Sequence, residues 1–89
     1  MMFILIKYGP ENPAERWKME AAAPEDQIVL IQNGIFWAIA EPAFLKGKKV
    51  AVVQPDLEAR GYSSQACSFP LVDYPGFIAL LEENPKSMS

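Results

Sequence analysis

The sequence contains no histidine, and Cys67 is its only cysteine. A Ser-His-Asp triad, a Cys-His pair and a histidine-based zinc site are therefore excluded within one chain. An intramolecular disulfide is also impossible, which agrees with a reducing compartment. These absences remove most of the common hydrolytic chemistry.

Basic residues are few and scattered along the chain. Eight basic and eleven acidic residues give a net charge of −3, and the basic residues cluster only at Lys46, Lys48 and Lys49. A protein that binds nucleic acid through phosphate contacts usually has a basic face. We therefore expect the three lysines to lie in a solvated loop and the chain to make no direct contact with nucleic acid.

Long apolar runs and nucleotide-binding glycine motifs are also missing. Residues 1–6 are apolar, but the run ends at Lys7 and is too short for a membrane span or a signal-peptide core. Neither a Gly-x-Gly-x-x-Gly pattern nor a P-loop occurs. We expect a cytoplasmic protein that has no membrane partner, no cofactor and no metal.

The chain is nevertheless apolar enough to fold, because 51% of its 89 residues are hydrophobic. This length allows a single domain over residues 1–89. Four short apolar segments, at residues 2–6, 28–31, 50–53 and 69–72, predict strands. The first three show no alternation, which is typical of strands covered on both faces.

The first helix signal follows the first predicted strand. Asn12 can cap a helix that begins at Pro13. Ala14, Trp17 and Ala21 recur at helical spacing, so we expect them to form its buried face.

Two later helices have similar signals. Asp56 and Asp73 stand where helix caps are needed, and Gly61 is placed to end the earlier helix in the left-handed conformation. The last helix is expected to bury Phe77, Leu80 and Leu81 and to stop at Pro85. Strands that alternate with helices predict an α/β fold with a mainly parallel sheet. Ligands of such sheets bind beyond the carboxyl ends of the strands, here after residues 6, 31, 53 and 72.

The dipeptide Asn33–Gly34 has two interpretations. Between two apolar runs it is a strong hairpin signal, and a hairpin would imply antiparallel strands. The alternative is a turn from a strand into a helix. On local signal alone the hairpin is the better interpretation.

Residues 35–40 are apolar on every side. A surface helix of a monomer should have a polar face, so we expect Ile35, Phe36 and Trp37 to lie at or beside a subunit interface. The alternative is a helix that is wholly buried within the chain.

Three stretches together resemble the TusB/DsrH family of sulfur-relay subunits: residues 28–35, 50–61 and 71–77. The family pattern has a strand ending in Gln/Glu-Asp-Gly, a strand followed by Asp-Leu-x-Ala-Arg-Gly, and a strand ending in Asp-Tyr-x-x-Phe. The similarity covers nearly the whole chain. The matching residues are Gln32, Asn33, Gly34, Asp56, Leu57, Arg60, Gly61, Asp73 and Tyr74.

The resemblance implies a three-layer α/β/α fold, related to the YchN-like and DsrEFH-like proteins, with a small, mainly parallel sheet of four to five strands. It therefore favours the strand-to-helix turn at Asn33–Gly34. It also implies association with two related subunits that resemble TusC/DsrF and TusD/DsrE. Such complexes pass persulfide sulfur toward 2-thiouridine at the tRNA wobble position or in the oxidation of sulfur compounds, and some relatives resemble stand-alone homodimers.

The chain departs from the family pattern at three places. Asn33 replaces the usual aspartate, and Ser89 stands where many relatives end near a tryptophan. Some family members have a cysteine in the helix after the first strand, where this chain has Lys18 and Met19. A sulfur-carrying role at that position is not carried over.

These observations favour a non-catalytic subunit of a sulfur-relay complex over an enzyme. One alternative is a stand-alone homodimeric binding module, and another is a sulfur acceptor that uses Cys67. A relay cysteine needs a thiolate favoured by nearby cations or a helix N-terminus, whereas the nearest basic residue in sequence is Arg60 and the residues after Cys67 lead into a strand. We expect Cys67 to be a packed thiol and not an obligatory persulfide carrier.

Overall fold

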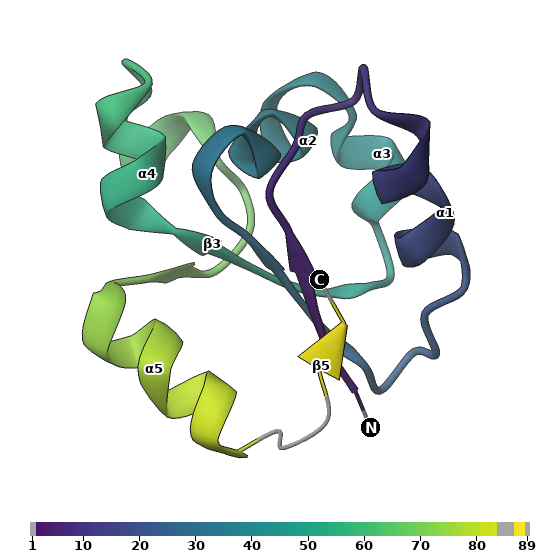
Figure 1. Cartoon of the computed structure of the whole chain (residues 1–89). Helices are drawn as coiled ribbons and strands as arrows, with labels where there is room; N and C mark the ends of the chain where they lie inside the picture. The colour runs from purple at the N-terminus through teal and green to yellow at the C-terminus, as the bar shows by residue number, and fades with distance from the viewer. Residues whose placement is uncertain (1, 84–86, 89) are drawn as a thin grey trace.

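The computed structural model describes residues 2–83 and the backbone of residues 87–88. Within these residues, five parallel strands form one sheet in the order β4-β3-β2-β1-β5 (Figure 1). The strands are β1 (Phe3–Ile6), β2 (Gln27–Leu30), β3 (Lys49–Val53), β4 (Leu71–Val72) and β5 (Ser87–Met88). The predicted small parallel sheet is confirmed.

The path of the chain determines which face of the sheet each helix covers. β1 to β4 follow one another across the sheet in one direction, and right-handed crossovers place the helices between them on one face. The connection from β4 to β5 runs back across the sheet, so its helix α5 lies on the other face, apart from α1 to α4 (Figure 1). The described helices are α1 (Pro13–Glu20), α2 (Phe36–Ala40), α3 (Pro42–Leu45), α4 (Gln54–Ala59) and α5 (Tyr74–Glu83), with 3₁₀ turns η1 (Gln32–Ile35) and η2 (Ser64–Ala66).

Alternating strand residues point to two cores, one on each face of the sheet. The larger core joins Ile4, Ile6, Ile28, Leu30, Val50 and Val52 of the strands to Met19, Ile35, Trp37, Ala38, Leu45 and Leu57. The smaller core consists of Phe3, Val29, Ala51 and Val53, with Phe77 and Leu80 of α5 packed against it. The three-layer α/β/α architecture is therefore confirmed, with one helix on one side and four on the other.

The strand-to-helix turn at Asn33–Gly34 is also confirmed. β2 leads directly into η1 and then α2, and β2 pairs in parallel with both of its neighbours. Gly34 is needed because the backbone of η1 approaches the end of β1 closely there, and not because the chain forms a hairpin. A Cβ at Gly34 would collide with the backbone carbonyl group of Ile6, at the end of the neighbouring strand.

We expect Gly34→Ala to lower the free energy of unfolding by about 2 kcal/mol or more, because the Ile6 backbone cannot move aside without disturbing β1. Urea unfolding measures this loss. The matched control is Gly9→Ala, whose added methyl meets only the flexible carboxylate of Glu11. That variant should change the free energy by no more than about 0.5 kcal/mol, and equal losses in the two variants would contradict the close-approach argument.

The predicted buried face of the first helix is wrong. Trp17 is 70% exposed, and Ala14 and Ala21 are exposed as well. The helix instead buries Glu15 and Met19. Apolar periodicity missed this face because one of its members is a carboxylate.

The buried carboxylate of Glu15 fastens the loop that follows β1. Its Oε2 accepts the backbone N–H groups of Lys7 at 2.8 Å and Tyr8 at 3.1 Å. Its Oε1 lies 2.7 Å from Nζ of Lys18, on the same helix. Both oxygens are therefore satisfied, which is the condition for burying a charge at this position.

This arrangement makes the stability of the protein depend on pH. Burial by itself would raise the pKa of Glu15, but hydrogen bonds from Lys18, Tyr8 and Lys7 and the charge of Lys18 lower it below its ordinary value. A carboxyl group whose pKa is lowered on folding adds stability above its unfolded pKa, and that stability is lost as the pH falls through the folded pKa. The free energy of unfolding should therefore fall as the pH drops below about 4.3.

We expect Glu15→Gln to cost about 2 kcal/mol at pH 7 and to flatten this acid dependence, because the charged acceptor is lost. Urea unfolding between pH 7 and pH 3 measures both effects. Glu20→Gln, on the exposed side of the same helix, should change the free energy by no more than about 0.5 kcal/mol. A Glu15→Gln protein with wild-type stability at pH 7 would show that the carboxylate does not fasten the loop.

Candidate functional site

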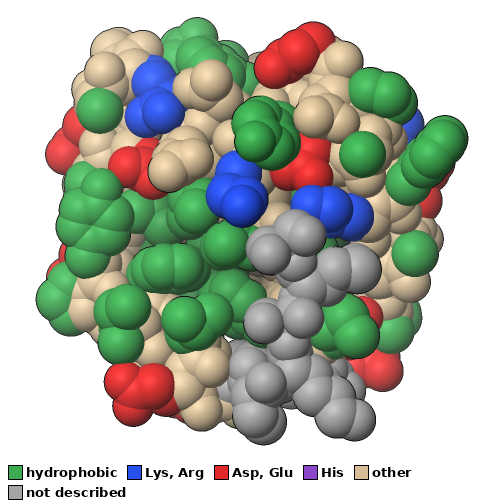
Figure 2. Space-filling view, in the orientation of Figure 1, with side chains coloured by type: hydrophobic (Ala, Val, Ile, Leu, Met, Phe, Trp, Pro, Cys, Tyr) green, Lys and Arg blue, Asp and Glu red, His purple; other side chains and the backbone are tan. Residues whose placement is uncertain are grey.

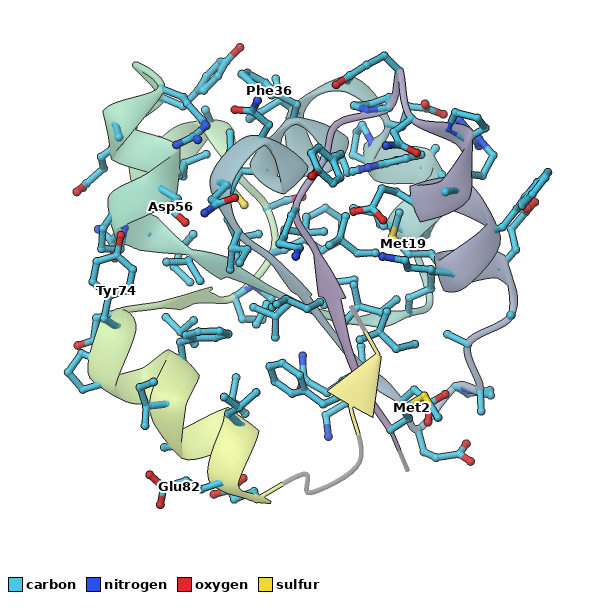
Figure 3. The ribbon with its side chains drawn as sticks, viewed as in Figure 1. Met2, Met19, Phe36, Asp56, Tyr74 and Glu82 are labelled. Atoms are coloured by element: carbon cyan, nitrogen blue, oxygen red, sulfur yellow. The ribbon has the colours of Figure 1, made fainter. Side chains whose placement is uncertain are left out.

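Polar residues of the family pattern gather at the carboxyl ends of β2, β3 and β4. Gln32 and Asn33 follow β2, Asp56 and Arg60 belong to the helical segment after β3, and Tyr74 begins α5 after β4. Figure 3 shows Asp56 on α4 and Tyr74 at the start of α5, on the same side of the molecule. We call these five residues the carboxyl-edge cluster. They lie at the sheet edge where the sequence predicts a site.

Asp56 joins the three strand ends. Its Oδ2 accepts the backbone N–H of Gln32 at 2.8 Å, and its Oδ1 accepts the hydroxyl of Tyr74 at 2.9 Å. The prediction that Asp56 caps a helix is therefore wrong. The N-cap of α4 is Val53, and Asp56 lies inside the first turn with its carboxylate directed to the neighbouring connections.

The bond to Asp56 coincides with backbone strain at Gln32. This residue has a φ of +50°, in the left-handed region that non-glycine residues seldom adopt. Such a conformation costs of the order of 1 kcal/mol and persists only where its surroundings impose it. The Asp56 carboxylate, together with the close approach of Gly34 to β1, supplies that constraint.

Arg60 explains how the chain accommodates Asn33 in place of the family's aspartate. The Nε of Arg60 donates to Oδ1 of Asn33 at 2.9 Å, and its Nη1 donates to the backbone oxygen of Asp56 at 3.2 Å. An amide oxygen accepts such a bond as an aspartate oxygen would. The substitution removes a charge from the cluster and keeps the link between the ends of β2 and β3.

The pKa of Tyr74 is raised, first by its hydrogen bond to Asp56 and then by the charge of that carboxylate. The phenol therefore remains protonated at neutral pH and acts as a hydrogen-bond donor. The ring is 53% exposed, and it is the one aromatic ring of the cluster.

Other residues of the family pattern have structural roles. Leu57 is wholly buried in the larger core, and Gly61 ends α4 with a φ of +87°, as predicted. Asp73 caps α5 as predicted, because its Oδ1 accepts the N–H of Gly76 at 2.7 Å. Ser89 and Pro85 lie outside the described residues.

The three predicted interface residues do not form one surface. Ile35 and Trp37 are fully buried within the chain, and Nε1 of Trp37 donates to the backbone oxygen of Tyr8 at 2.9 Å. Burial accounts for the all-round apolar character on which the interface prediction was based. Phe36 alone keeps some exposure, with its ring edge-on to Tyr62 at a centroid distance of 6.1 Å.

Cys67 lies at the end of η2, half-buried against the larger core. Its sulfur is 3.7 Å from the backbone oxygen of Phe69. This is the environment expected of a packed thiol. Its part in sulfur transfer stays a prediction.

The described residues provide no group of three or more His, Cys, Asp or Glu side chains that could bind a metal. The part of the chain that the structure describes contains no pocket. None of its described helices is both long enough and apolar enough to span a membrane.

Comparison with known proteins shows to which family the chain belongs. A model of the family described as DsrH-like protein matches residues 12–87. The chain belongs to the DsrH-like family. The family resemblance of the sequence is thereby confirmed. No curated protein matches the chain.

The fold of this DsrH-like chain is similar to two solution NMR structures of Tm0979 from Thermotoga maritima. The first is 45% identical, covers 97% of both chains and has a TM-score of 0.78. The second, described as a proposed sulfur transferase, is 44% identical, covers 100% of both chains and has a TM-score of 0.73.

The carboxyl-edge cluster predicts a measurable coupling between Asp56 and Tyr74. We expect Asp56→Ala to cost about 2 kcal/mol, because it removes the charged acceptor that the N–H of Gln32 and the hydroxyl of Tyr74 share. Tyr74→Phe should cost about 1 kcal/mol, and the double variant no more than Asp56→Ala alone. Urea unfolding of the four proteins measures the coupling.

The control is Glu58→Ala, on the exposed side of the same short helix, which should stay within about 0.5 kcal/mol of the wild type. Additive losses from Asp56→Ala and Tyr74→Phe would show that the two side chains act independently.

Proposed function

We propose that the chain is a non-catalytic subunit of a sulfur-relay complex. The observation that carries the proposal is the DsrH-like match over residues 12–87, whose motif residues come together at one edge of the sheet. The similarity to Tm0979, described as a proposed sulfur transferase, supports the same chemistry. In such a relay a thiolate attacks the outer sulfur of a persulfide, the S–S bond breaks, and the donor leaves as a thiolate.

The non-catalytic role is supported by the residues at the position where some family members have a cysteine. Lys18 is ion-paired with Glu15, and Met19 is buried in the larger core. Neither residue can accept a sulfur atom as a thiolate does. The reactive cysteine of the relay is therefore proposed to belong to a partner subunit.

The proposed partners are paralogous α/β subunits that resemble TusC/DsrF and TusD/DsrE. The carboxyl-edge cluster and the half-buried Phe36 are the proposed contact region, because Gln32, Asn33 and Tyr74 are exposed on the surface there. The final acceptor is proposed to be the tRNA wobble uridine or an intermediate of sulfur oxidation. The net charge of −3 favours contact with tRNA through another component of the complex.

Co-expression with the two paralogous subunits of the same organism tests the proposal. We expect the three chains to purify together and to pass ³⁵S from a persulfide-loaded cysteine desulfurase to the acceptor. Omitting this chain should lower the transfer at least tenfold. Cys67→Ser should keep the wild-type rate, because the packed thiol is not in the path of the sulfur.

Arg60→Ala should lower the yield of the complex several-fold, and Glu58→Ala, on the same helix, is its control. Loss of transfer in an assembled Cys67→Ser complex would make the chain a sulfur carrier. Recovery of this chain without either partner would favour a stand-alone binding module.

A further inference from the structure

Two helices carry exposed apolar side chains. On α5, Phe77 and Leu80 pack on the smaller core, as predicted. Ile78 is 48% exposed and Leu81 is 37% exposed, so the predicted burial of Leu81 is wrong. On α1, Trp17 is 70% exposed, which is the largest fraction among the large apolar side chains of the described residues. The most exposed aromatic ring of this part of the chain therefore lies on α1.

The amphipathic pattern of α1 is inverted. Its inward face carries the buried Glu15 and Met19, whereas Ala14, Trp17 and Ala21 are exposed. The three exposed residues recur at intervals of three and four, so they lie on one side of the helix. A helix normally presents apolar residues at this spacing to a core or to another helix. We call these three residues the outer face of α1. Figure 2 shows apolar side chains at the right-hand rim of the molecule, where Figure 1 places α1.

Contacts on the inward side fix the rotation of α1 about its axis. The carboxylate of Glu15 binds the loop after β1, and the side chain of Met19 is wholly buried in the larger core. The Nη2 of Arg16 donates to the two carboxylate oxygens of Glu41 at 2.8 Å and 2.6 Å. The helix cannot turn Trp17 inward without breaking these contacts. The fold of a single chain therefore keeps the outer face exposed.

The charges that lack a partner near the outer face are acidic. The two basic residues of α1, Arg16 and Lys18, form ion pairs with carboxylates of the same chain. Glu11 precedes the helix and Glu20 is its last residue; both are exposed, and within the described residues neither forms an ion pair. A helix of this length is about 12 Å long. One acidic group therefore stands near each end of the outer face.

This charge distribution discriminates between two kinds of occupant. If a second copy placed its α1 on the outer face in the parallel direction, each Glu20 would meet the same residue of the other copy. In the antiparallel direction, each Glu20 would meet a Glu11. Like charges meet in both directions, and such contacts oppose binding. Basic residues at the two ends of an apolar stripe would complement the outer face.

We propose that the outer face of α1 binds a basic amphipathic helix of another protein. Trp17 packs into the apolar face of that helix, and Glu11 and Glu20 pair with lysine or arginine residues about two turns apart. The small side chains of Ala14 and Ala21 allow the two helices to approach closely beside the ring. The proposal is independent of the sulfur-relay function, because it rests on α1 and not on the carboxyl-edge cluster.

NMR titration of the ¹⁵N-labelled protein tests the proposal. The probes are two synthetic helical peptides with the same leucine stripe, one with two lysines about two turns apart and one with glutamates in their place. We expect the lysine peptide to shift the amide signals of residues 13–21 and the glutamate peptide to bind at least tenfold more weakly. Trp17→Ala should weaken the lysine peptide at least tenfold, because tryptophan is a typical hot-spot residue. Its control, Ile78→Ala, truncates an exposed apolar residue of α5 and should bind like the wild type.

Charge reversal tests the acidic ends of the outer face separately. Glu20→Lys should weaken binding of the lysine peptide and strengthen binding of the glutamate peptide. Glu58→Lys, on the exposed side of α4, should change either affinity by no more than about twofold. Circular dichroism verifies that each variant is folded.

Four results would overturn the proposal. They are the absence of amide shifts with the lysine peptide, shifts that lie outside α1, equal binding of the two peptides, and unchanged binding by folded Trp17→Ala. A wild-type dimer that dissociates in Trp17→Ala would also overturn it, because a second copy would then occupy the outer face.

Discussion

The carboxylate of Asp56 holds together the edge of the sheet at which the family residues gather. β2 and β4 lie on either side of β3. Asp56 bonds to Gln32, two residues beyond β2, and to Tyr74, the first residue of the helix after β4. The strained backbone of Gln32 is stable in this setting because its N–H has a charged acceptor. The residues of the family pattern therefore hold the carboxyl ends of β2, β3 and β4 in a fixed arrangement relative to one another. The hydrogen bond from Arg60 to Asn33 adds a further link between the ends of β2 and β3.

The order of the strands explains the rest of the architecture. Because the chain steps across the sheet in one direction and returns once, four helices lie on one face and α5 lies on the other. The face under the four helices contains the buried Trp37 and the buried end of α1. On the face under α5, Leu5 and Ile31 are only half-buried.

Much of the fold could be predicted from the sequence, because strands and caps are local signals. The continuous apolar runs, the cap at Asn12 and the stop at Gly61 all lie where the residues place them. The turn at Gly34 needed the family resemblance, since the glycine serves a contact with Ile6, which lies 28 residues earlier in the chain. Rules that predict structure from neighbouring residues cannot predict a contact between residues so far apart in the chain.

Some side chains were predicted wrongly because their hydrogen-bond partners lie far away in the sequence. Others were predicted wrongly because apolar periodicity does not consider that a charged side chain can be buried. Asp56 has the local pattern of a cap, but its partners belong to two other connections. The buried face of α1 depends on the carboxylate of Glu15, which serves the loop after β1. Trp17 followed the apolar rule for burial and is exposed because that carboxylate occupies the inner face.

The central claim is that Asp56 fixes the strained end of β2, and amide hydrogen exchange measures it most directly. The Gln32 amide should be protected in the wild type and should exchange at least about tenfold faster in Asp56→Ala, relative to the amide of Val29 in the middle of β2. A Gln32 amide that exchanges at the same relative rate in both proteins would contradict the account.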